Sequence, residues 1–294
     1  MQTVKRLVSS DGSIKYIFKN HNGYYCEAIY YRLEPKNNVP YERYHICISS
    51  QFGCKMRCSF CDTGNLGFCH NLSYAEMLDE INLVRQDIIK TDAENVSTKY
   101  SAVIMGMGEP LNNFENINKF CTTLSTKDTR LKTIPISSVG IVPLIPKLAQ
   151  LQNQLTNIKF FVSLHSPYDE QRSQIMPINK QYNISSLLSA CRQYHLDTNT
   201  KVTLSYMLIE GVNDSEKHLN DLIKLINPDH FKVQLLLYNN TTDAKFIRPT
   251  IDTAQIFNER LKRNGISSII RVSKGQDISG GCGQLIALQK NKQK

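Results

Sequence analysis

Tryptophan is absent from the 294 residues, and so is any apolar run of 18 or more residues. A transmembrane helix needs about 20 consecutive apolar residues, so no membrane span is expected. Residues 1–15 are polar and lack the apolar core of a signal peptide, which predicts a cytoplasmic protein. Hydrophobic residues still make up 41% of the chain, which is enough for the core of one large domain or two small ones.

Acidic residues are fewer than basic ones. The chain has 35 Lys and Arg against 26 Asp and Glu, which gives a net charge of +9 and a pI near 9.0. A basic balance favours a polyanionic partner, because binding releases the counterions condensed on it. A generally basic surface would give the same numbers. Charge alone therefore favours a nucleic-acid partner only modestly.

A disulfide framework is not expected either. The nine cysteines are an odd number in a long chain, which is atypical of secreted, disulfide-stapled domains. In a reducing cytosol, clustered cysteines indicate metal ligands or catalytic thiols instead. Cys121 and Cys191 lie within apolar helical patterns and are expected to be small core residues.

Short β-rich runs alternate with helical patterns along most of the chain. Strands are expected at 44–49, 101–106, 133–138, 158–164, 202–208, 231–238 and 268–272. Helices are expected at 74–89, 114–124, 144–151, 184–195, 215–225 and 253–263. Asn183 and Asp214 precede two of these helices and are expected to cap them. The alternation is typical of an α/β fold with a parallel sheet, which right-handed crossovers coil into a barrel or part of one.

The first forty residues follow a different pattern. Residues 16–18 and 24–31 alternate like the two strands of a β-hairpin around Asn22 and Gly23. We therefore predict a small antiparallel extension at 1–40, followed by the main domain at 41–294.

Three closely spaced cysteines follow the first strand of the alternation. They are Cys54, Cys58 and Cys61, with the spacing CxxxCxxC. Three thiolates on one loop can bind three irons of a 4Fe–4S cluster and leave the fourth iron open to chelate a substrate. A structural zinc site is the alternative, with Cys69 or His70 as the fourth ligand, but the position of the loop after a strand disfavours it.

Polar residues and glycines follow several of the expected strands, where a parallel barrel carries its chemistry. They are Gly108, Glu109, Ser137, Ser163, His165 and Asn239. Gly108 allows close approach of a ligand to the backbone, and Glu109 offers an acceptor to an ammonium group. A lone histidine such as His165 is more often structural, but in this series a ring of ligand contacts is the better interpretation.

Two further cysteines lie outside the cluster motif. Cys282 has glycines on both sides in a loop after the last strand, which is typical of an accessible thiol and not of core packing. Cys47 lies at the end of the first strand, seven residues before Cys54. From its spacing alone, Cys47 fits a buried strand residue and a functional thiol equally well.

Taken together, these stretches resemble the RlmN/Cfr family of radical S-adenosylmethionine (SAM) RNA methyltransferases, over roughly residues 22 to 286. The matching segments are 47–54, 54–61, 106–111, 163–166, 177–180, 211–214 and 277–285. The resemblance implies a partial (β/α)6 barrel of the radical SAM type with a short N-terminal β-hairpin extension. It also implies a 4Fe–4S cluster held by Cys54, Cys58 and Cys61, whose open iron binds the amino and carboxylate groups of SAM.

The resemblance further implies a mechanism with two thiols. One SAM molecule methylates Cys282, and a second is cleaved at the cluster to a radical that takes hydrogen from the new methyl group. The resulting carbon radical adds to an adenine, and Cys47 then attacks the sulfur, which releases the methylated base and leaves a Cys47–Cys282 disulfide. Glu27 matches an acidic residue of the family and would act as a proton acceptor.

The same resemblance implies the remaining ligands and partners. The SAM contacts would be Gly108, Glu109, Ser137, Ser163, His165 and Asn239. The substrate would be carbon 2 of an adenine in ribosomal or transfer RNA, and the electrons would come from a reducing partner such as flavodoxin.

The chain departs from the family pattern in three places. A helical accessory domain usually precedes the hairpin, and here only about twenty residues do. Val139 replaces a hydroxyl residue, and the segment 234–240 lacks the two prolines of the family pattern. Methylation of carbon 8, a substrate other than RNA, and a noncatalytic RNA-binding relative therefore remain as alternatives, the last of them ranked lowest. The sequence does not indicate an oligomeric state.

Overall fold

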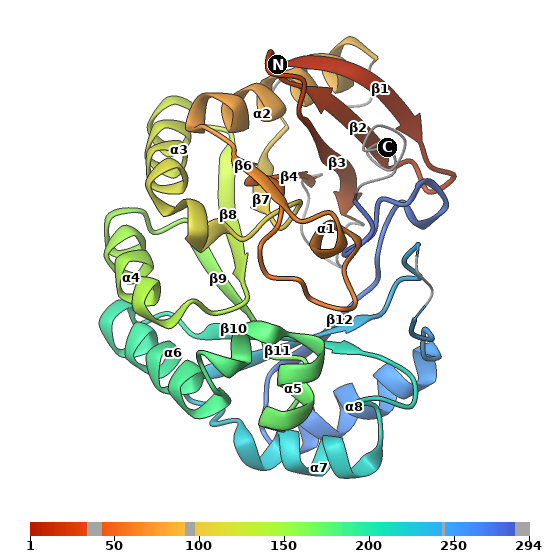
Figure 1. The fold of residues 1–294 in the computed structure, drawn as a ribbon. Coiled ribbons are helices and arrows are strands. Elements are labelled where there is room, and N and C mark those ends of the chain that lie inside the picture. Colours follow the sequence, from red (N-terminus) through yellow and green to blue (C-terminus); the bar gives the residue numbers. More distant parts are fainter. Residues whose placement is uncertain (34–42, 92–97, 243–244, 286–294) are drawn as a thin grey trace.

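Ten strands form one continuous sheet in the computed structural model, which describes residues 1–33, 43–91, 98–242 and 245–285. The strand order is β1-β2-β3-β4-β7-β8-β9-β10-β11-β12. The sheet curves around a central space, and helices cover its outer side (Figure 1). A separate two-stranded ribbon joins β5 (Gln51–Gly53) to β6 (Phe68–Asn71).

Seven neighbouring strands of the sheet are parallel. They are β4 (Arg43–Ile48), β7 (Tyr100–Ile104), β8 (Leu131–Ser138), β9 (Ile158–Ser163), β10 (Val202–Leu208), β11 (Phe231–Leu237) and β12 (Ser268–Arg271). All five residues of β7 are buried, as are nearly all those of β10 and β11. Strands buried on both faces are continuous apolar runs, which is why the sequence located them to within a few residues.

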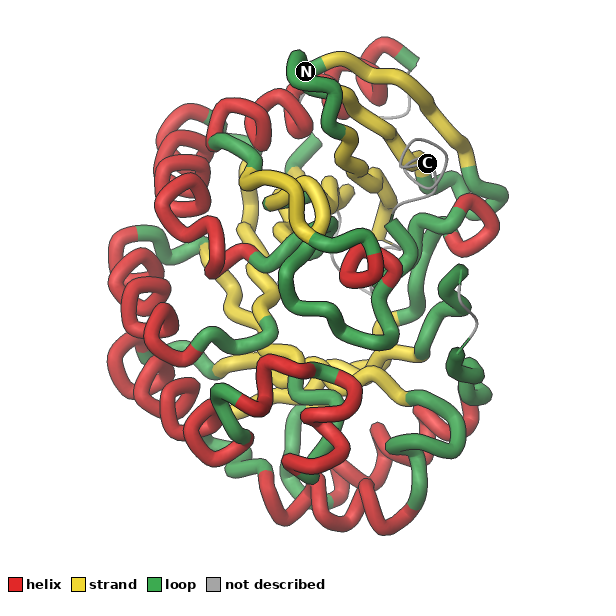
Figure 2. The backbone as a smooth tube through the Cα atoms, viewed as in Figure 1, coloured by secondary structure: helices red, strands yellow, loops and turns green. Residues whose placement is uncertain are grey.

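The longer helices pack outside the strands, as the red segments around the yellow ones in Figure 2 show, whereas the short helix α1 (Asp62–Asn65) lies near the centre of the view (Figure 1). The other helices are α2 (Tyr74–Lys90), α3 (Phe114–Lys127), α4 (Ile145–Gln154), α5 (Asp169–Ile175), α6 (Ile184–Thr198), α7 (Glu216–Leu225) and α8 (Ile251–Arg263). Each of the six strands from β4 to β11 in this parallel series is followed by a helix, and β12 is the final strand. The predicted partial (β/α)6 barrel is confirmed. Cys121 and Cys191 are fully buried on α3 and α6, as expected.

One of the two predicted helix caps is correct. The side chain of Asn183 accepts a hydrogen bond from Ser186 N at 2.9 Å at the start of α6. The prediction for Asp214 is wrong by one residue, because Ser215 caps α7. The Asp214 carboxylate instead accepts from Gly211 N at 3.0 Å and closes the preceding turn.

The N-terminal strands form an antiparallel ribbon that continues the barrel sheet. It consists of β1 (Gln2–Val8), β2 (Ile14–Lys19) and β3 (Tyr25–Leu33), and β3 pairs antiparallel with β4. The hairpin predicted around Asn22 and Gly23 is present. The strand β1 was not predicted, because it is almost wholly exposed and has no apolar alternation. The boundary predicted at residue 40 lies outside the described residues.

A buried lysine joins two strands of this ribbon and also contacts the far end of the chain. Lys15 Nζ on β2 lies 2.9 Å from Glu27 Oε2 on β3, and both side chains are almost completely buried. Lys15 Nζ also donates to the carbonyl oxygen of Ser279 at 3.1 Å. We call residues 272–285, which follow β12 and carry Cys282, the thiol loop. The ribbon therefore supports the thiol loop directly.

Substitution Lys15→Met should lower the free energy of unfolding by about 3–5 kcal/mol, because it leaves the Glu27 carboxylate buried without its partner. The double variant K15M/E27Q should recover part of that loss, since it removes the uncompensated charge as well. Urea unfolding under anaerobic conditions measures both. A K15M protein as stable as the wild type would show that the pair does not hold the ribbon.

Candidate active site

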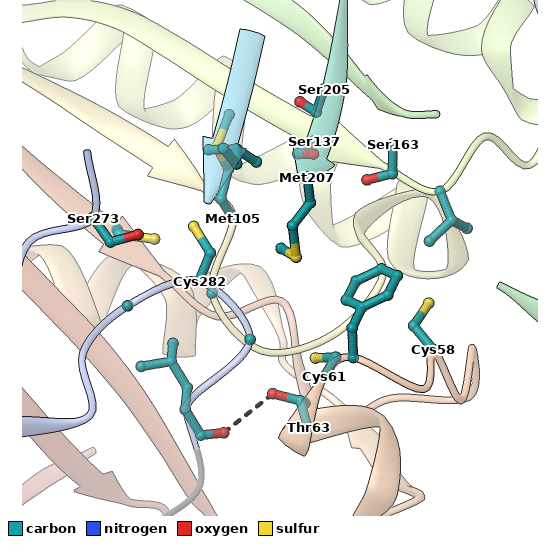
Figure 3. Close-up of a pocket in the computed structure, with 18 of the residues that line it drawn as sticks. Cys58, Cys61, Thr63, Met105, Ser137, Ser163, Ser205, Met207, Ser273 and Cys282 are labelled. Carbon is teal, nitrogen blue, oxygen red and sulfur yellow. Dashed lines mark hydrogen bonds between the residues drawn. The ribbon is translucent and has the colours of Figure 1, made fainter. Parts of the chain in front are cut away.

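A pocket opens at the carboxyl ends of the parallel strands, where a barrel of this kind is expected to bind its ligands. It encloses about 1320 Å³ of open space, with its mouth to solvent included. Figure 3 shows Cys282 rising from the thiol loop on one side of this space and Cys58 on the other, with Met207 pointing between them. The pocket therefore brings residues from both ends of the chain together.

The cysteine triad lines the pocket from the loop between β5 and α1. Backbone hydrogen bonds shape this loop: Cys54 N donates to Gly67 O at 2.8 Å, and Cys61 N donates to Cys58 O at 3.1 Å. Cys54 and Cys58 are buried and Cys61 is half-buried. Burial raises the pKa of Cys54 to about 12, and burial together with the other two sulfurs raises the pKa of Cys58. Three sulfurs in such surroundings become thiolates only around a positively charged centre, so the triad fits an iron–sulfur cluster.

The triad does not have the geometry of a mononuclear zinc site. In the part of the chain that the structure describes, no three His, Cys, Asp or Glu side chains converge as they would around one ion. A 4Fe–4S cluster places each thiolate on a different iron, so its ligands lie farther apart than those of a single ion. Cys69 is exposed, and His70 Nδ1 is hydrogen-bonded to Asn71 O at 2.6 Å. Neither lines the pocket, so neither supplies a fourth ligand in this arrangement.

Gly108 and Glu109 lie on the cluster side of the pocket, after β7. Gly108 has φ +101°, and a Cβ atom there would lie 2.6 Å from the Gln51 side chain, so only glycine fits. Glu109 is buried and accepts hydrogen bonds from Ser138 Oγ (2.7 Å), Leu111 N (2.9 Å) and Val139 N (2.8 Å). A carboxylate has about four acceptor positions, so one remains for an ammonium group. Burial raises the pKa of Glu109 to about 6, although its hydrogen bonds act in the opposite direction.

His165, Ser137 and Ser163 line the pocket from the ends of β9 and β8. His165 is buried, and its Nδ1 accepts from Met207 N at 3.0 Å, so its proton lies on Nε2. Burial, together with the nearby Arg172 guanidinium, lowers the pKa of His165 to about 3. The imidazole therefore stays neutral at physiological pH and offers one N–H donor.

Asn239 is held by the thiol loop in this structure. Its Nδ2 donates to Ser273 Oγ at 2.9 Å and to Cys282 O at 3.1 Å, and its Oδ1 accepts from Arg248 at 2.7 Å. Asn239 is not among the residues that line the pocket. These contacts make it a support for the thiol loop, and its contact with SAM stays a prediction.

Cys47 and Cys282 line the same pocket and are both free thiols. Cys47 lies on β4, paired with Ile29 of β3, whereas Cys282 projects from the thiol loop. Glu27 lies on the same face of β3 as Ile29, one side-chain position further along, but it does not line the pocket. Its carboxylate pairs with Lys15, which contacts the thiol loop. The role of Glu27 as proton acceptor therefore stays a prediction.

Several structural residues of the site were missed from the sequence. Arg172 on α5 is buried and donates to the carbonyl oxygens of Leu164, Val139 and Ser163, which fixes the ends of β8 and β9. Asn213 donates to His165 O and Met207 O, both at 2.7 Å. The segments 177–180 and 211–214 point to this region in the sequence, but their supporting role becomes visible only in three dimensions.

Comparisons with known proteins agree with this fold and site. Residues 48–223 match the family model described as the radical SAM superfamily, so the fold and the cysteine loop belong to a radical SAM enzyme. The chain is 39% identical to the dual-specificity RNA methyltransferase RlmN of Wolinella succinogenes, over 97% of this chain and 80% of that protein. It is 36% identical to RlmN 2 of Myxococcus xanthus, over 95% and 72% of the two chains. The chain therefore belongs to the RlmN family of radical SAM methyltransferases.

Solved structures support the same assignment. A radical SAM methyltransferase from Sphaerobacter thermophilus superposes with a TM-score of 0.86 at 33% identity, over 97% of this chain and 81% of that one. The SAM-bound enzyme SuiB of Streptococcus suis shares the fold, with a TM-score of 0.57 at 11% identity, over 79% and 51% of the two chains. Membership in the superfamily implies a 4Fe–4S cluster and SAM as cofactors. Among the described residues, no helix is both long and apolar enough to span a membrane.

Substitution Cys58→Ala should abolish cluster binding, because two thiolates cannot hold the cluster that three hold. Iron and sulfide per protein should fall to background after anaerobic reconstitution, while the matched variant Cys69→Ala keeps full occupancy. Loss of iron in the C69A variant would instead indicate a site with four cysteine ligands.

The affinity for SAM should fall at acidic pH. Because its pKa is raised to about 6, Glu109 is ionised above that pH and neutral below it, where it no longer attracts the amino group of SAM. SAM binding should thus be constant from pH 7 to about pH 8, where the amino group itself begins to lose its proton, and should weaken by up to about tenfold per unit below pH 6. Equilibrium binding at constant cluster content measures this, and Glu109→Gln should bind weakly with a flat profile. A wild-type affinity unchanged down to pH 5 would remove Glu109 from the site.

Proposed function

We propose that the protein methylates carbon 2 of an adenine in ribosomal or transfer RNA through a methyl group carried on Cys282. One observation carries this proposal: two free thiols, Cys47 and Cys282, share one pocket with the cluster cysteines. A radical enzyme that only cleaved SAM would need the triad alone. A pair of thiols beside the triad fits a reaction that forms and then breaks a bond to sulfur.

The residues of the chain supply the binding and the nucleophiles. We infer that Glu109 accepts a hydrogen bond from the amino group of SAM, that Gly108 allows the close approach, and that Ser137, Ser163 and the His165 N–H meet its polar groups. The cluster, when bound, supplies the electron that cleaves SAM to a 5′-deoxyadenosyl radical. Before that, the Cys282 sulfur takes a methyl group from SAM by displacement.

The two thiols then complete the transfer. The methyl group on Cys282 loses a hydrogen atom, and the resulting carbon radical adds to carbon 2 of the adenine. The Cys47 thiolate attacks the Cys282 sulfur, so that a sulfur–sulfur bond forms and the sulfur–carbon bond breaks. Glu27 accepts the proton that leaves carbon 2. The same proton then passes to the methylene carbon and completes the new methyl group. The whole transfer releases one proton, from the Cys47 thiol to solvent, and one electron, which would go to the 4Fe–4S cluster.

The partners follow from this chemistry. The net charge of +9 suits an RNA substrate, whose phosphates attract a basic protein. A reducing partner such as flavodoxin would supply the electron for SAM cleavage and return the Cys47–Cys282 disulfide to thiols. We place this reaction in the cytoplasm, where RNA and such reductants occur together.

Substitution Cys47→Ala should trap the protein on its RNA, because the sulfur–carbon bond of the adduct can no longer be broken. Anaerobic reaction with SAM, a reductant and ribosomal or transfer RNA should give a covalent complex that survives denaturing electrophoresis. The matched variant Cys282→Ala should give neither the complex nor methylated RNA, since it cannot accept the methyl group.

The wild-type product identifies the carbon that is methylated. Mass spectrometry of the digested RNA should find 2-methyladenosine, whereas 8-methyladenosine would correct the proposed carbon. No label transfer from SAM into any RNA, with 5′-deoxyadenosine still produced, would move the substrate outside RNA.

A further inference from the structure

A guanidinium group with no role so far lies beside the two thiols. Arg271 is the last residue of β12, and its Nη2 donates to Tyr31 Oη at 2.6 Å. Its Nη1 lies 3.4 Å from the sulfur of Met105. Arg271, Tyr31 and Met105 all line the pocket together with Cys47 and Cys282. The contact joins the last parallel strand to the N-terminal ribbon, 240 residues apart in the chain.

A hydrogen-bonded chain fixes the direction of this guanidinium. Tyr31 on β3 is paired with His45 on β4, and Tyr31 Oη lies 2.9 Å from His45 Nδ1. A guanidinium only donates, so Tyr31 Oη accepts from Arg271 and its own proton points to His45. His45 lies two residues before Cys47 and so on the same face of β4. The chain from His45 through Tyr31 to Arg271 therefore lies along the wall that carries Cys47.

The chemistry of Cys47 needs such a cation. The thiolate, not the thiol, attacks sulfur, yet burial raises the pKa of Cys47 to about 12. Cys282 on the thiol loop and Glu80 on α2 act in the same direction, because their negative forms repel a thiolate. Arg271 acts in the opposite direction, together with the backbone N–H of Met105. Tyr31 stays neutral, because burial raises its pKa above its ordinary value.

We propose that Arg271, oriented by Tyr31 and His45, is a positioning residue that stabilises the thiolate of Cys47 for the step that forms the Cys47–Cys282 disulfide. This inference rests on the proposed function. In that step the electron pair of the Cys47 thiolate forms the sulfur–sulfur bond, and the pair of the sulfur–carbon bond leaves with the methylene carbon, which takes a proton. The cation assists by being in place before the thiolate forms.

A guanidinium in the pocket of an RNA-modifying enzyme could instead bind a phosphate group. The contacts favour the thiol role, because one terminal nitrogen of Arg271 already donates to Tyr31 and the other terminal nitrogen faces Met105, both on the pocket wall. A phosphate contact predicts weaker RNA binding in Arg271 variants and an unchanged thiol, so one set of variants separates the two roles.

The direct test is the pH dependence of alkylation of Cys47 in the reduced holoenzyme, followed by mass spectrometry without any turnover. In Arg271→Met the profile should shift by about one pH unit to the alkaline side, which slows alkylation about tenfold near neutral pH. Arg271→Lys should restore most of the rate, and Tyr31→Phe should shift the profile by less. The exposed Cys69 serves as the reference thiol, and Arg192→Met removes an exposed cation from the outer helix α6 as the charge control.

A second measurement links the thiol to the reaction. In a single turnover at pH 7, R271M should accumulate the covalent RNA adduct, and the adduct should resolve when the pH is raised. Equal alkylation profiles in wild type and R271M would overturn the proposal, as would weaker RNA binding with an unchanged profile. R271K and Y31F keep the test valid if R271M fails to fold. If the wild-type enzyme transfers no methyl group and R271M still shifts the alkylation profile, the result counts against the proposed function and not against the effect of Arg271 on Cys47.

Discussion

The hydrogen bonds between the N-terminal ribbon and the thiol loop determine where Cys282 lies. Ser9 Oγ donates to the Asp277 carboxylate, and Lys15 Nζ donates to Ser279 O. On the other flank, Asn239 Nδ2 donates to Cys282 O. A glycine-rich loop has little preferred structure of its own, so these contacts are what orient its thiol toward the pocket. The ribbon therefore supports the active site, although neither of its first two strands, β1 and β2, lines the pocket.

Charge is distributed unequally across the pocket, and the distribution matches the two halves of the chemistry. The carboxylate of Glu109 lies on the cluster side, where the amino group of SAM would bind. The guanidinium of Arg271 lies on the thiol side, where negative sulfur must form. His165, which lines the same pocket, is kept neutral because burial lowers its pKa. A site that handles a sulfonium cation and a thiolate in sequence needs opposite fields at its two ends.

Local patterns predicted the parts of this structure that are local in the chain. The buried strands are apolar runs, and the CxxxCxxC spacing places three thiols on one loop, so both were found from the sequence. The exposed strand β1 has no such pattern, and the cap of α7 falls on Ser215 because Asp214 is used in the turn before it. The contact of Arg271 with Tyr31 could not be predicted, because the two residues are 240 apart in the chain and no local pattern indicates that their strands meet across the pocket.

The central claim is that Cys282 carries the methyl group. Protein isolated anaerobically from cells that make it, then digested and analysed by tandem mass spectrometry, tests this claim most directly. The account predicts S-methylcysteine at position 282 and unmodified cysteine at position 47, with the methyl group labelled when the cells receive methyl-labelled methionine. Protein that holds its cluster and cleaves SAM, yet never carries a methyl group on Cys282, would contradict the account.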